Sequence, residues 1–358
     1  MNPAGCSVLY LGPRSGTCLD RARALRRLGA SVEHLDLREL LPASPWVDRW
    51  TWHVGGHWFG RRIDSGLQRV LGQRRFDVCH VDGGEWVTPQ VVARLRRHAR
   101  RIVNYNIDDP TGPRDGARFA AYRQAVPDYD LLVVVREENL PELRRLGARR
   151  CMRVFRSADE VSHAPRAVSA LDRIAWGSDV LFLGSWFPDR GPFLLELIER
   201  GVPLTIRGPN WHKAPEWKRL QAHWAGGAIG GDDYARAIQC ARVNLGLLSH
   251  DNRDRHTTRS LEIPALGGLL CAERTDEHER LYREGEEAVF WRDAKECAEV
   301  CAALLADEPR RDRLAQAGQR RYQRDGHHNE RVMQRILRAA LDEGPATVIE
   351  AAMHSEHA

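Results

Sequence analysis

Short apolar runs alternate with amphipathic stretches along the first 155 residues. The apolar runs predict strands at 7–11, 31–35, 76–81, 101–107, 131–135 and 152–155. Helical spacing of apolar residues predicts helices at 19–28, 89–98, 116–124 and 138–146. This alternation is typical of a parallel sheet covered by helices, so we expect one doubly wound domain here.

The apolar rhythm weakens between Ser157 and Ser178 and then restarts, which indicates a second domain of the same kind. Strands are predicted at 180–183, 204–206, 243–248 and 269–272, and helices at 193–199, 234–241, 259–266 and, as two or three helices, 294–341. The expected fold class is α/β, with two Rossmann-like doubly wound domains facing a central cleft. We divide the chain into an N-terminal domain at 1–160, a linker at 161–178, a C-terminal domain at 179–325, a terminal helix at 326–342 that packs back on the N-terminal domain, and a loose tail at 343–358.

The composition fits a globular protein, with 42% hydrophobic and 29% charged residues. No window reaches the roughly 18 apolar residues that a membrane span needs, and no signal peptide is expected. The eight cysteines form no C-x-x-C pair, and Cys297 and Cys301 are spaced as helix neighbours without a second pair that would complete a metal site. We therefore expect reduced thiols and a cytoplasmic protein.

The formal net charge of +5 suits phosphate-bearing ligands or an anionic membrane surface. A nucleic-acid partner is not expected, because basic residues are not interleaved with aromatic residues on a recognisable nucleic-acid-binding module.

The most informative stretch is LGLLSHDNRDRHTTRSLEIPALGGLL, residues 245–270. An apolar strand is followed by a polar loop, and a helix is predicted to begin at Thr257 or Thr258. Free N–H groups at a helix start favour an anion, the two hydroxyls add donors, and Arg259 could reach a diphosphate. Glu262, three residues later, falls on the same helical face, where a carboxylate can accept hydrogen bonds from ribose hydroxyls.

The alternative is a polar loop before a surface helix, with Arg259 and Glu262 as a simple ion pair. The position favours a ligand site, because an open parallel sheet binds ligands beyond the carboxyl ends of its strands.

Four further runs are informative: RSLEIPALGGLLCAERTDEH (259–278), LYREGEEAVFW (281–291), VLFLGSWFPDRGPFL (180–194) and NYNIDDPTG (104–112). These runs resemble the CgeB-like, spore-maturation-type branch of group 1 glycosyltransferases. Asp254 and Glu262 also resemble the acidic-x7-Glu signature of GT-B glycosyltransferases, in which the second acid holds the ribose and the first lies near the donor sugar; here Asp replaces the usual first Glu. The resemblance implies a GT-B fold, a nucleoside-diphosphate-sugar donor, and no cofactor or essential metal.

Further donor-site candidates lie elsewhere in the chain. Arg190 follows the first strand of the second domain, where GT-B enzymes commonly place a basic residue on the donor phosphates, and it could equally be a helix-capping surface residue. Trp211 could stack on the nucleobase or belong to the core. Gly16, in a strand-to-helix turn that is not G-x-G-x-x-G, could let the backbone approach the donor, and the plain-turn interpretation stays open. We add His256, in the polar loop, to the donor set.

Three carboxylates follow first-domain strands and are candidates for acting on the acceptor hydroxyl. We rank them Asp108, Glu85, Asp109. Asp-Asp-Pro is also a good turn, and paired carboxylates suggest Mg²⁺, although a GT-B fold stabilises its leaving group with arginines and helix dipoles.

An aromatic and basic region contains Trp46, Trp50, Trp52, Trp58 and Phe59 with several arginines and histidines. It could contact a sugar acceptor or a membrane that holds a lipid-linked acceptor, or it could be a packing segment.

The sequence therefore favours transfer of a sugar to a glycan, lipid-linked or protein acceptor in bacterial glycoconjugate or surface-glycan assembly. We place this reaction in the cytoplasm, with the inner face of the membrane and peripheral membrane contact as an alternative. A nucleotide-sugar epimerase of the same fold, and a non-catalytic nucleotide-sugar- or glycan-binding protein, are the competing hypotheses.

Overall fold

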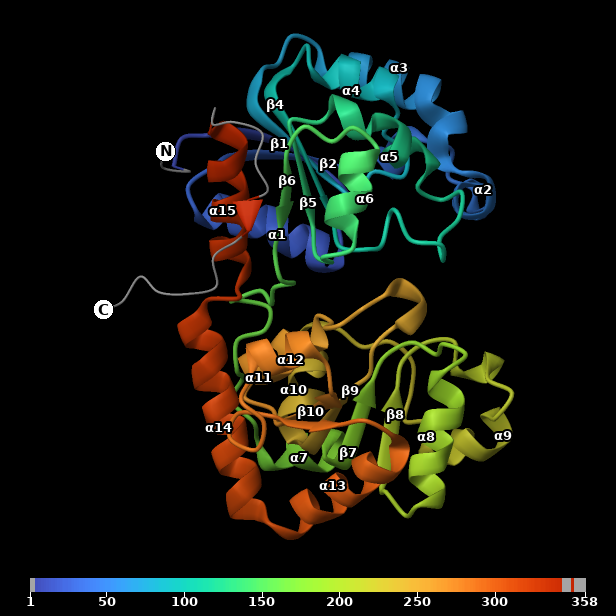
Figure 1. Cartoon of the computed structure of the whole chain (residues 1–358), viewed down its shortest axis with the longest axis vertical. Coiled ribbons are helices and arrows are strands. Elements are labelled where there is room, and N and C mark those ends of the chain that lie inside the picture. The colour runs from blue at the N-terminus through green and yellow to red at the C-terminus, as the bar shows by residue number, and fades with distance from the viewer. Residues whose placement is uncertain (1–3, 343–348, 351–358) are drawn as a thin grey trace. The chain divides into compact units, whose positions relative to one another are not determined.

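The computed structural model describes residues 4–342 and 349–350 and contains two compact units (Figure 1). Unit 1 is Met1–Arg156, Asp251–Arg253 and His328–Ala358, and unit 2 is Ser157–His250 and Asp254–His327.

Unit 1 is built on a seven-stranded parallel sheet of order β12-β6-β5-β4-β3-β1-β2. The strands are β1 Ser7–Leu11, β2 Ser31–Leu35, β3 Phe76–Asp82, β4 Ala99–Asn106, β5 Leu131–Val134, β6 Cys151–Arg153 and β12 Ile349–Glu350. The helices are α1 Gly16–Arg27, α2 Pro45–Val54, α3 Gly60–Leu71, α4 Pro89–Leu95, α5 Ala120–Ala125, α6 Asn139–Arg145 and α15 Asn329–Leu341, with short 3₁₀ turns η1 Leu37–Leu40, η2 Gly56–Phe59 and η3 Val126–Asp128.

Alternation along the strands supplies two apolar faces to this sheet. Val8 and Tyr10 point to one face and join residues of α1 and α15 in one core cluster, whereas Leu9 and Leu11 point to the other and join residues of α3, α4 and α5. The helix α15 thus completes the covering of the unit 1 sheet through apolar residues such as Ile336.

Unit 2 is built on a five-stranded parallel sheet of order β11-β10-β9-β7-β8. The strands are β7 Ser178–Leu183, β8 Leu204–Arg207, β9 Ala241–Gly246, β10 Leu270–Glu273 and β11 Val289–Trp291. The helices are α7 Ala170–Trp176, α8 Arg190–Glu199, α9 Trp217–Leu220, α10 Gly231–Cys240, α11 Arg259–Ala265, α12 Asp276–Leu281, α13 Ala294–Ala306 and α14 Glu308–Asp325, with 3₁₀ turns η4 Trp211–Lys213 and η5 Gln221–His223; the turn η6 is His250–Asn252.

Residues of α8 and α13 pack on one face of the unit 2 sheet, with Val243 and Leu245 of β9 in the same cluster. The side chain of Asn244, between them, points to the other face and donates to the carbonyl of Ile238 in α10.

The predicted strands are confirmed, with ends that shift by one or two residues. Residues 46–62 were predicted only as an aromatic and basic region, and they lie in α2, η2 and the start of α3, none of which was predicted. The elements α7, α9, α12 and β11 were also missed, and each has seven residues or fewer, too short for apolar spacing to repeat twice.

Helix α7 lies inside the stretch predicted as linker, and it begins with a capping box in which Ser169 and Asp172 bond each other's backbone amides. The predicted loose tail lies outside the described residues except for β12, which pairs with β6. Among the helices that the structure describes, none is long and apolar enough to cross a membrane.

Candidate functional site

The loop after β9 and the helix α11 carry the predicted donor residues between Asp254 and Glu262, whereas Arg190, Trp211 and Gly16 lie in other elements. Helix α11 begins at Arg259, and Thr258 is its N-cap residue. The backbone amide of Thr257 donates to Oγ of Ser260 at 3.0 Å, whereas the buried Thr257 hydroxyl has no hydrogen-bond partner among the described residues. Since an unpartnered buried hydroxyl is costly, a polar ligand atom here would satisfy it.

Arg259 and Glu262 form the centre of a buried cluster. Nη1 of Arg259 donates to Oε2 of Glu262 at 2.6 Å, and the hydroxyl of Tyr234 in α10 donates to the same oxygen at 2.5 Å. The other carboxylate oxygen, Oε1, lies 3.5 Å from Nε2 of His163. The Arg259 guanidinium also lies 4.9 Å from the centre of the Tyr234 ring. We refer to these four residues as the donor cluster.

Burial and charge act in opposite directions on this cluster. Glu262 is 2% exposed, and this burial alone would raise its pKa, yet Arg259, His163 and the Tyr234 hydroxyl hold the pKa below its ordinary value. Burial lowers the pKa of Arg259, but Tyr234 and Glu262 outweigh it and raise that pKa. The pair is therefore ionised at neutral pH.

Arg259 keeps a donor for a ligand. Its Nε bonds the carbonyl of Leu183, at the end of β7, and its Nη1 is occupied by Glu262 and Thr258. Nη2 has no hydrogen-bond partner within the part of the chain that is described, and 30% of the side chain is exposed. A guanidinium anchored at two corners with a third edge open is suited to an anionic oxygen.

The remaining loop residues are divided between the interior and the surface. His256 is buried, and its Nδ1 bonds the carboxylate of Glu277 in α12, so its ring points into the protein. The half-buried Asp254 donates its backbone amide to the carbonyl of Ser249 at 3.3 Å. This backbone bond folds the loop back toward the end of β9.

Arg190 ties two loops of unit 2 together. Its guanidinium donates to the carbonyl of Ser185 after β7 at 2.9 Å and to that of Leu248 after β9 at 3.0 Å. Its face lies 4.4 Å from the ring centre of Phe187. With the side chain buried and these donors on backbone carbonyls, the geometry favours a positioning role over direct contact with phosphate.

Trp211 lies in the core of unit 2, at 1% exposure. Its indole N–H donates to the carbonyl of Gly184 at 3.0 Å, and its ring packs edge-on against Phe182. This is the core alternative predicted for Trp211, and a nucleobase could stack on the ring only if the surrounding side chains moved. The carbonyl oxygen of Gly184 also explains why position 208 is a glycine, because a Cβ at Gly208 would lie 2.0 Å from that oxygen.

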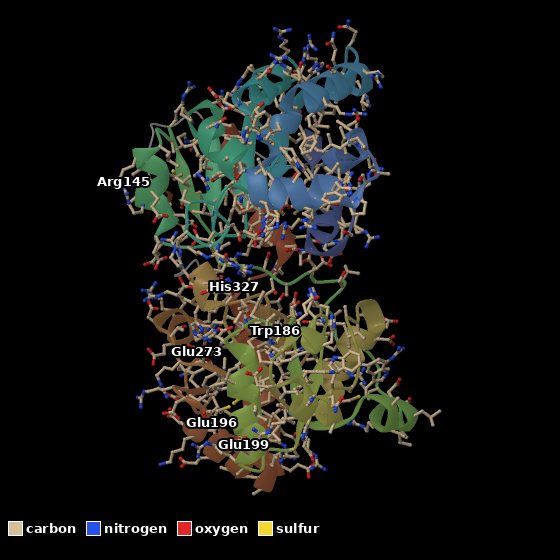
Figure 2. All side chains as sticks on the ribbon, turned by 90° about the vertical axis from the view of Figure 1, so that its right-hand side faces the viewer. Arg145, Trp186, Glu196, Glu199, Glu273 and His327 are labelled. Carbon is tan, nitrogen blue, oxygen red and sulfur yellow. The ribbon has the colours of Figure 1, made fainter. Side chains whose placement is uncertain are left out.

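His250 is held between two carboxylates at the carboxyl edge of the unit 2 sheet. Nδ1 lies 2.9 Å from Asp189 and Nε2 lies 2.8 Å from Glu273. These two hydrogen bonds raise its pKa to about 10. Figure 2 shows Glu273 and Trp186, both near the carboxyl ends of strands, toward one end of unit 2.

Two hollows of unit 2 lie away from this edge. One of about 440 Å³ is lined by Glu196 and Glu199, toward the other end of α8 in Figure 2. The other, of about 560 Å³, is lined by residues at the amino ends of strands, including Ser178 and Ala241. We place the candidate site by its chemistry, since ligands of parallel sheets bind at the carboxyl edge.

In unit 1, one arginine holds two of the three predicted catalytic carboxylates. Nη2 of Arg118 lies 2.6 Å from Glu85 and 3.1 Å from Asp108, and Nη1 lies 3.1 Å from Asp115. The side chains of Glu85 and Asp108 are 21% and 37% exposed. Burial lowers the pKa of Arg118, but its carboxylate partners raise that pKa by more. The guanidinium of Arg118 therefore stays charged. We refer to Glu85 and Asp108 as the acid pair.

The turn that carries Glu85 depends on glycine. Gly84 has a φ of 115°, in the left-handed region, and its amide donates to Oε2 of Glu85 at 3.1 Å. The chain therefore turns directly after β3 and leaves Glu85 at the carboxyl edge of the sheet.

Asp109 is placed differently from its neighbour. It is 1% exposed, and its oxygens accept from Arg253 (2.5 and 2.7 Å), from Asn139 at 2.7 Å and from the amide of Gly112 at 3.0 Å. Arg253 belongs to the segment 251–253 of unit 1 and also bonds Glu142. Three of these bonds end on Oδ1 and one on Oδ2, so Asp109 is buried and held by its neighbours, and the geometry favours the acid pair for proton transfer.

Gly16 is the first residue of α1 and has a φ of 53°. A Cβ at this position would meet no atom within 4 Å. The glycine thus serves the turn into the helix, and the space beside it is open.

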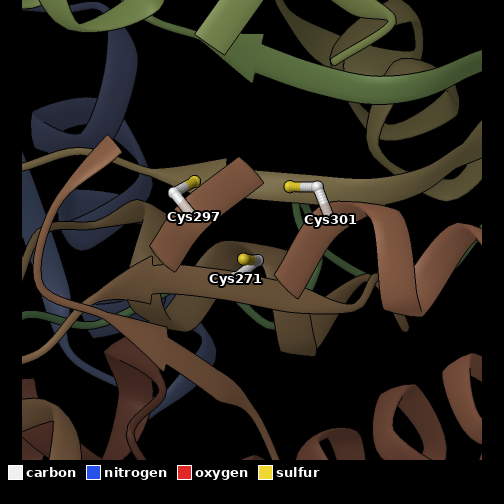
Figure 3. A group of neighbouring side chains, drawn as sticks. All are labelled: Cys271, Cys297 and Cys301. Carbon is white, nitrogen blue, oxygen red and sulfur yellow. The ribbon is translucent and has the colours of Figure 1, made fainter. Parts of the chain in front are cut away.

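Three buried cysteines of unit 2 converge (Figure 3). Cys271 of β10 and Cys297 and Cys301 of α13 have sulfur atoms within 4.8 Å of one another. Sequence spacing marked the helical pair but not Cys271, because a strand and a helix far apart in sequence bring the third thiol in. Thiolates suit soft ions rather than Mg²⁺, and the cluster is part of the apolar core between β10 and α13.

The donor cluster and the acid pair both include or contact residues that no sequence motif identified. Tyr234, His163 and Arg118 were not predicted as site residues. Tyr234 lies near the start of a helix predicted at 234–241, and nothing in that pattern identifies its hydroxyl as a partner of Glu262.

The C-terminal part of the chain matches a known family. Residues 190–338 match a family model described as glycosyl transferase-like. No curated protein matches the chain. Among solved structures, a sucrose-phosphate synthase from Thermosynechococcus elongatus is similar, with a TM-score of 0.68 and 13% identity over 93% of this chain and 98% of that chain.

Two further solved structures have the same architecture. Anabaena HepE in complex with UDP-glucose gives a TM-score of 0.64 at 11% identity, over 93% of this chain and 100% of that chain. A putative UDP-N-acetylglucosamine 2-epimerase from Listeria monocytogenes gives 0.57 at 10% identity, over 94% and 96%. At these identities the likeness shows the fold, and the predicted α/β fold of GT-B type is confirmed. The family match covers the C-terminal part of the chain, and the likeness over almost the whole chain is one of architecture, that of the GT-B fold.

Proposed function

We propose that the protein transfers a sugar from a nucleoside-diphosphate-sugar donor to an acceptor hydroxyl. One observation carries this proposal: the segment that matches a glycosyltransferase-like family contains Arg259 and Glu262, joined at 2.6 Å, and, two residues before Arg259, a buried Thr257 hydroxyl that has no hydrogen-bond partner among the described residues.

The donor cluster offers complementary groups to a nucleoside diphosphate. Nη2 of Arg259 and the hydroxyls of Thr257 and Thr258 would donate to the diphosphate and neutralise it as it departs. Among the described residues, Oε1 of Glu262 has only His163 beside it, at 3.5 Å, and it retains capacity to accept from a ribose hydroxyl. Asp254 would lie near the donor sugar, and Arg190 would position the loop.

The acid pair would act on the acceptor. Asp108, the more exposed of the two, is our first candidate for the general base, with Glu85 second. Arg118 would hold both carboxylates in position while one accepts the proton. We propose that no metal or cofactor takes part, since Arg259 can supply the positive charge that the leaving group needs.

We further propose membership of the CgeB-like branch, transfer of a hexosyl group, and a role in bacterial glycoconjugate or surface-glycan assembly in the cytoplasm. The runs at 104–112, 180–194, 259–278 and 281–291 support the branch.

A thermal-shift titration with UDP, GDP, TDP and CMP sugars tests the donor. We expect stabilisation by one nucleotide class, lost in the Arg259→Ala variant; no shift with any of them would favour a structural protein. Product detection on a pool of candidate acceptors then separates transfer from epimerisation, because an epimerase would convert the donor with no acceptor present.

A further inference from the structure

The segment from α2 to η2 of unit 1 exposes an unusual amount of tryptophan. Trp46, Trp50, Trp52 and Trp58 are 69%, 47%, 45% and 65% exposed, and Val54 between them is exposed as well. Tryptophan is normally among the most buried side chains by area, so four exposed rings so close together in the chain indicate a surface with a partner. We call residues 45–62 the tryptophan surface.

The backbone beneath these rings is firmly anchored. Ser44 caps α2 by accepting from the amide of Trp46, and Val47 and Thr51 form its buried side. Oγ1 of Thr51 accepts from the indole of Trp86 at 2.9 Å. Gly56 is packed so closely that a Cβ would lie 2.0 Å from the carbonyl of Glu85. The exposed rings are therefore carried by a well-anchored backbone, and the helix α2 lies at one side of unit 1 in Figure 1.

The polar residues of the tryptophan surface are almost all basic. Arg49 lies over the Trp46 ring at 5.3 Å, and Arg61 and Arg62, at the start of α3, are exposed. Asp48 is the one acidic residue of the stretch, and it is bonded to Arg38 at 2.9 Å.

The composition of the tryptophan surface favours a lipid surface over a soluble glycan as its partner. Sugar hydroxyls need acceptors as well as donors, and the stretch contains no Asn, Gln or Glu. Tryptophan beside arginine instead suits the headgroup region of a bilayer, where the indole rings sit at the interface and the guanidinium groups meet lipid phosphates.

The tryptophan surface is joined to the acid pair by one side chain. The guanidinium of Arg118 lies over the ring of Trp52 at 5.0 Å while it bonds Glu85 and Asp108. A lipid held at Trp52 would thus be next to the proposed general base.

We propose that the tryptophan surface docks the protein on an anionic bilayer and that the acceptor hydroxyl is carried by a lipid in that bilayer. This inference rests on the proposed function for the acceptor and on the exposed rings and arginines for the docking.

The test is sedimentation of the full chain with vesicles of phosphatidylglycerol and phosphatidylcholine, compared with vesicles of phosphatidylcholine alone. We expect binding to the anionic vesicles, weakened by salt, and a roughly tenfold or greater loss of partitioning in the triple variant W46A/W50A/W58A. A charge-reversal variant, R49E/R61E/R62E, should lose the preference for anionic lipid.

The matched control removes exposed apolar groups elsewhere: Leu171 and Ile174 of α7 are 76% and 81% exposed, and the variant L171A/I174A should bind vesicles as the parent does. Failure of the parent chain to bind anionic vesicles, or unchanged binding by the triple variant, would overturn the proposal. Binding to soluble glycans without vesicle binding would replace it with a carbohydrate platform.

Donor titration keeps the two proposals distinguishable. The triple variant should retain the thermal shift with nucleotide sugars, because its substitutions lie outside unit 2. Vesicle binding without any donor shift would sink the proposed function alone, and a donor shift without vesicle binding would overturn the docking alone.

Discussion

The donor cluster of unit 2 and the acid pair of unit 1 hold their charges in different ways. Glu262 is almost fully buried and has three protein partners, whereas Glu85 and Asp108 are partly exposed and share a single arginine. A buried carboxylate held in place by protein partners is a fixed acceptor of hydrogen bonds. A partly exposed one can exchange its proton with a substrate or with water. The difference suits the first group to binding and the second to proton transfer.

The largest expected effect comes from removing the exposed carboxylates. Asp108→Asn should lower kcat by about 10²–10⁴-fold, because the amide cannot accept the acceptor proton, while the donor thermal shift stays unchanged. Glu85→Gln is the matched variant on the same arginine and should have the smaller effect. Full turnover in both variants, measured by product formation, would mean that the acid pair is not the base.

Breaking the buried pair should affect folding as well as binding. Arg259→Ala removes the closest cationic partner of the buried Glu262 and leaves only Tyr234 and His163 beside its charge, so we expect a loss of about 3–5 kcal/mol in the free energy of unfolding and a weaker donor shift. Chemical denaturation and donor titration separate the two effects. Tyr234→Phe removes one hydrogen bond without removing the charge partner, and it should cost only about 1 kcal/mol. Unaltered donor affinity in a folded Arg259→Ala chain would contradict the binding role.

The core position of Trp211 predicts a loss of stability without a change in the donor site. Trp211→Phe removes the indole bond to Gly184 and part of the ring volume, so the free energy of unfolding should fall by roughly 1–3 kcal/mol. Donor affinity in the folded variant should equal that of the parent. Weaker donor affinity at full stability would return Trp211 to the nucleobase pocket.

The smallest effect is expected at His250, which is paired like the donor cluster but exposed like the acid pair. Its pKa is raised from 6.5 to about 10, so its contribution to stability is fully present below pH 6.5 and is lost as the pH rises through about 10. An NMR titration of the imidazole should show a protonated ring at neutral pH. His250→Gln should flatten the fall in melting temperature above neutral pH, and a ring that titrates near 6.5 would contradict the assignment.

Features that depend on local sequence pattern could be predicted, whereas contacts that depend on long-range packing could not. Apolar runs marked the parallel strands because a buried strand needs apolar side chains on both faces. The spacing of Arg259 and Glu262 placed them on one helical face, and the structure joins them at 2.6 Å. Tyr234, however, reaches Glu262 from another helix, and no local pattern encodes that contact.

The two neighbouring carboxylates of unit 1, Asp108 and Asp109, also show that local sequence does not determine which side chain is exposed. Asp108 and Asp109 are adjacent in sequence and were predicted as the first and third candidate bases, yet Asp108 is partly exposed beside Arg118 and Asp109 is buried against Arg253. Which of two neighbouring carboxylates faces solvent depends on the packing around the turn. The helix α2 was missed because its tryptophans point outward and leave few apolar residues on the buried side.

All eight cysteines are buried, which has a practical consequence for labelling. A folded chain without surface thiols leaves a maleimide dye nothing to react with, so a cysteine introduced at an exposed position would be modified alone. Cysteine could replace the exposed Ser65 of unit 1 and the exposed Glu196 of unit 2, and each could then be labelled with a dye. Energy transfer between the two dyes would then report any motion between the units when the donor or a vesicle is added.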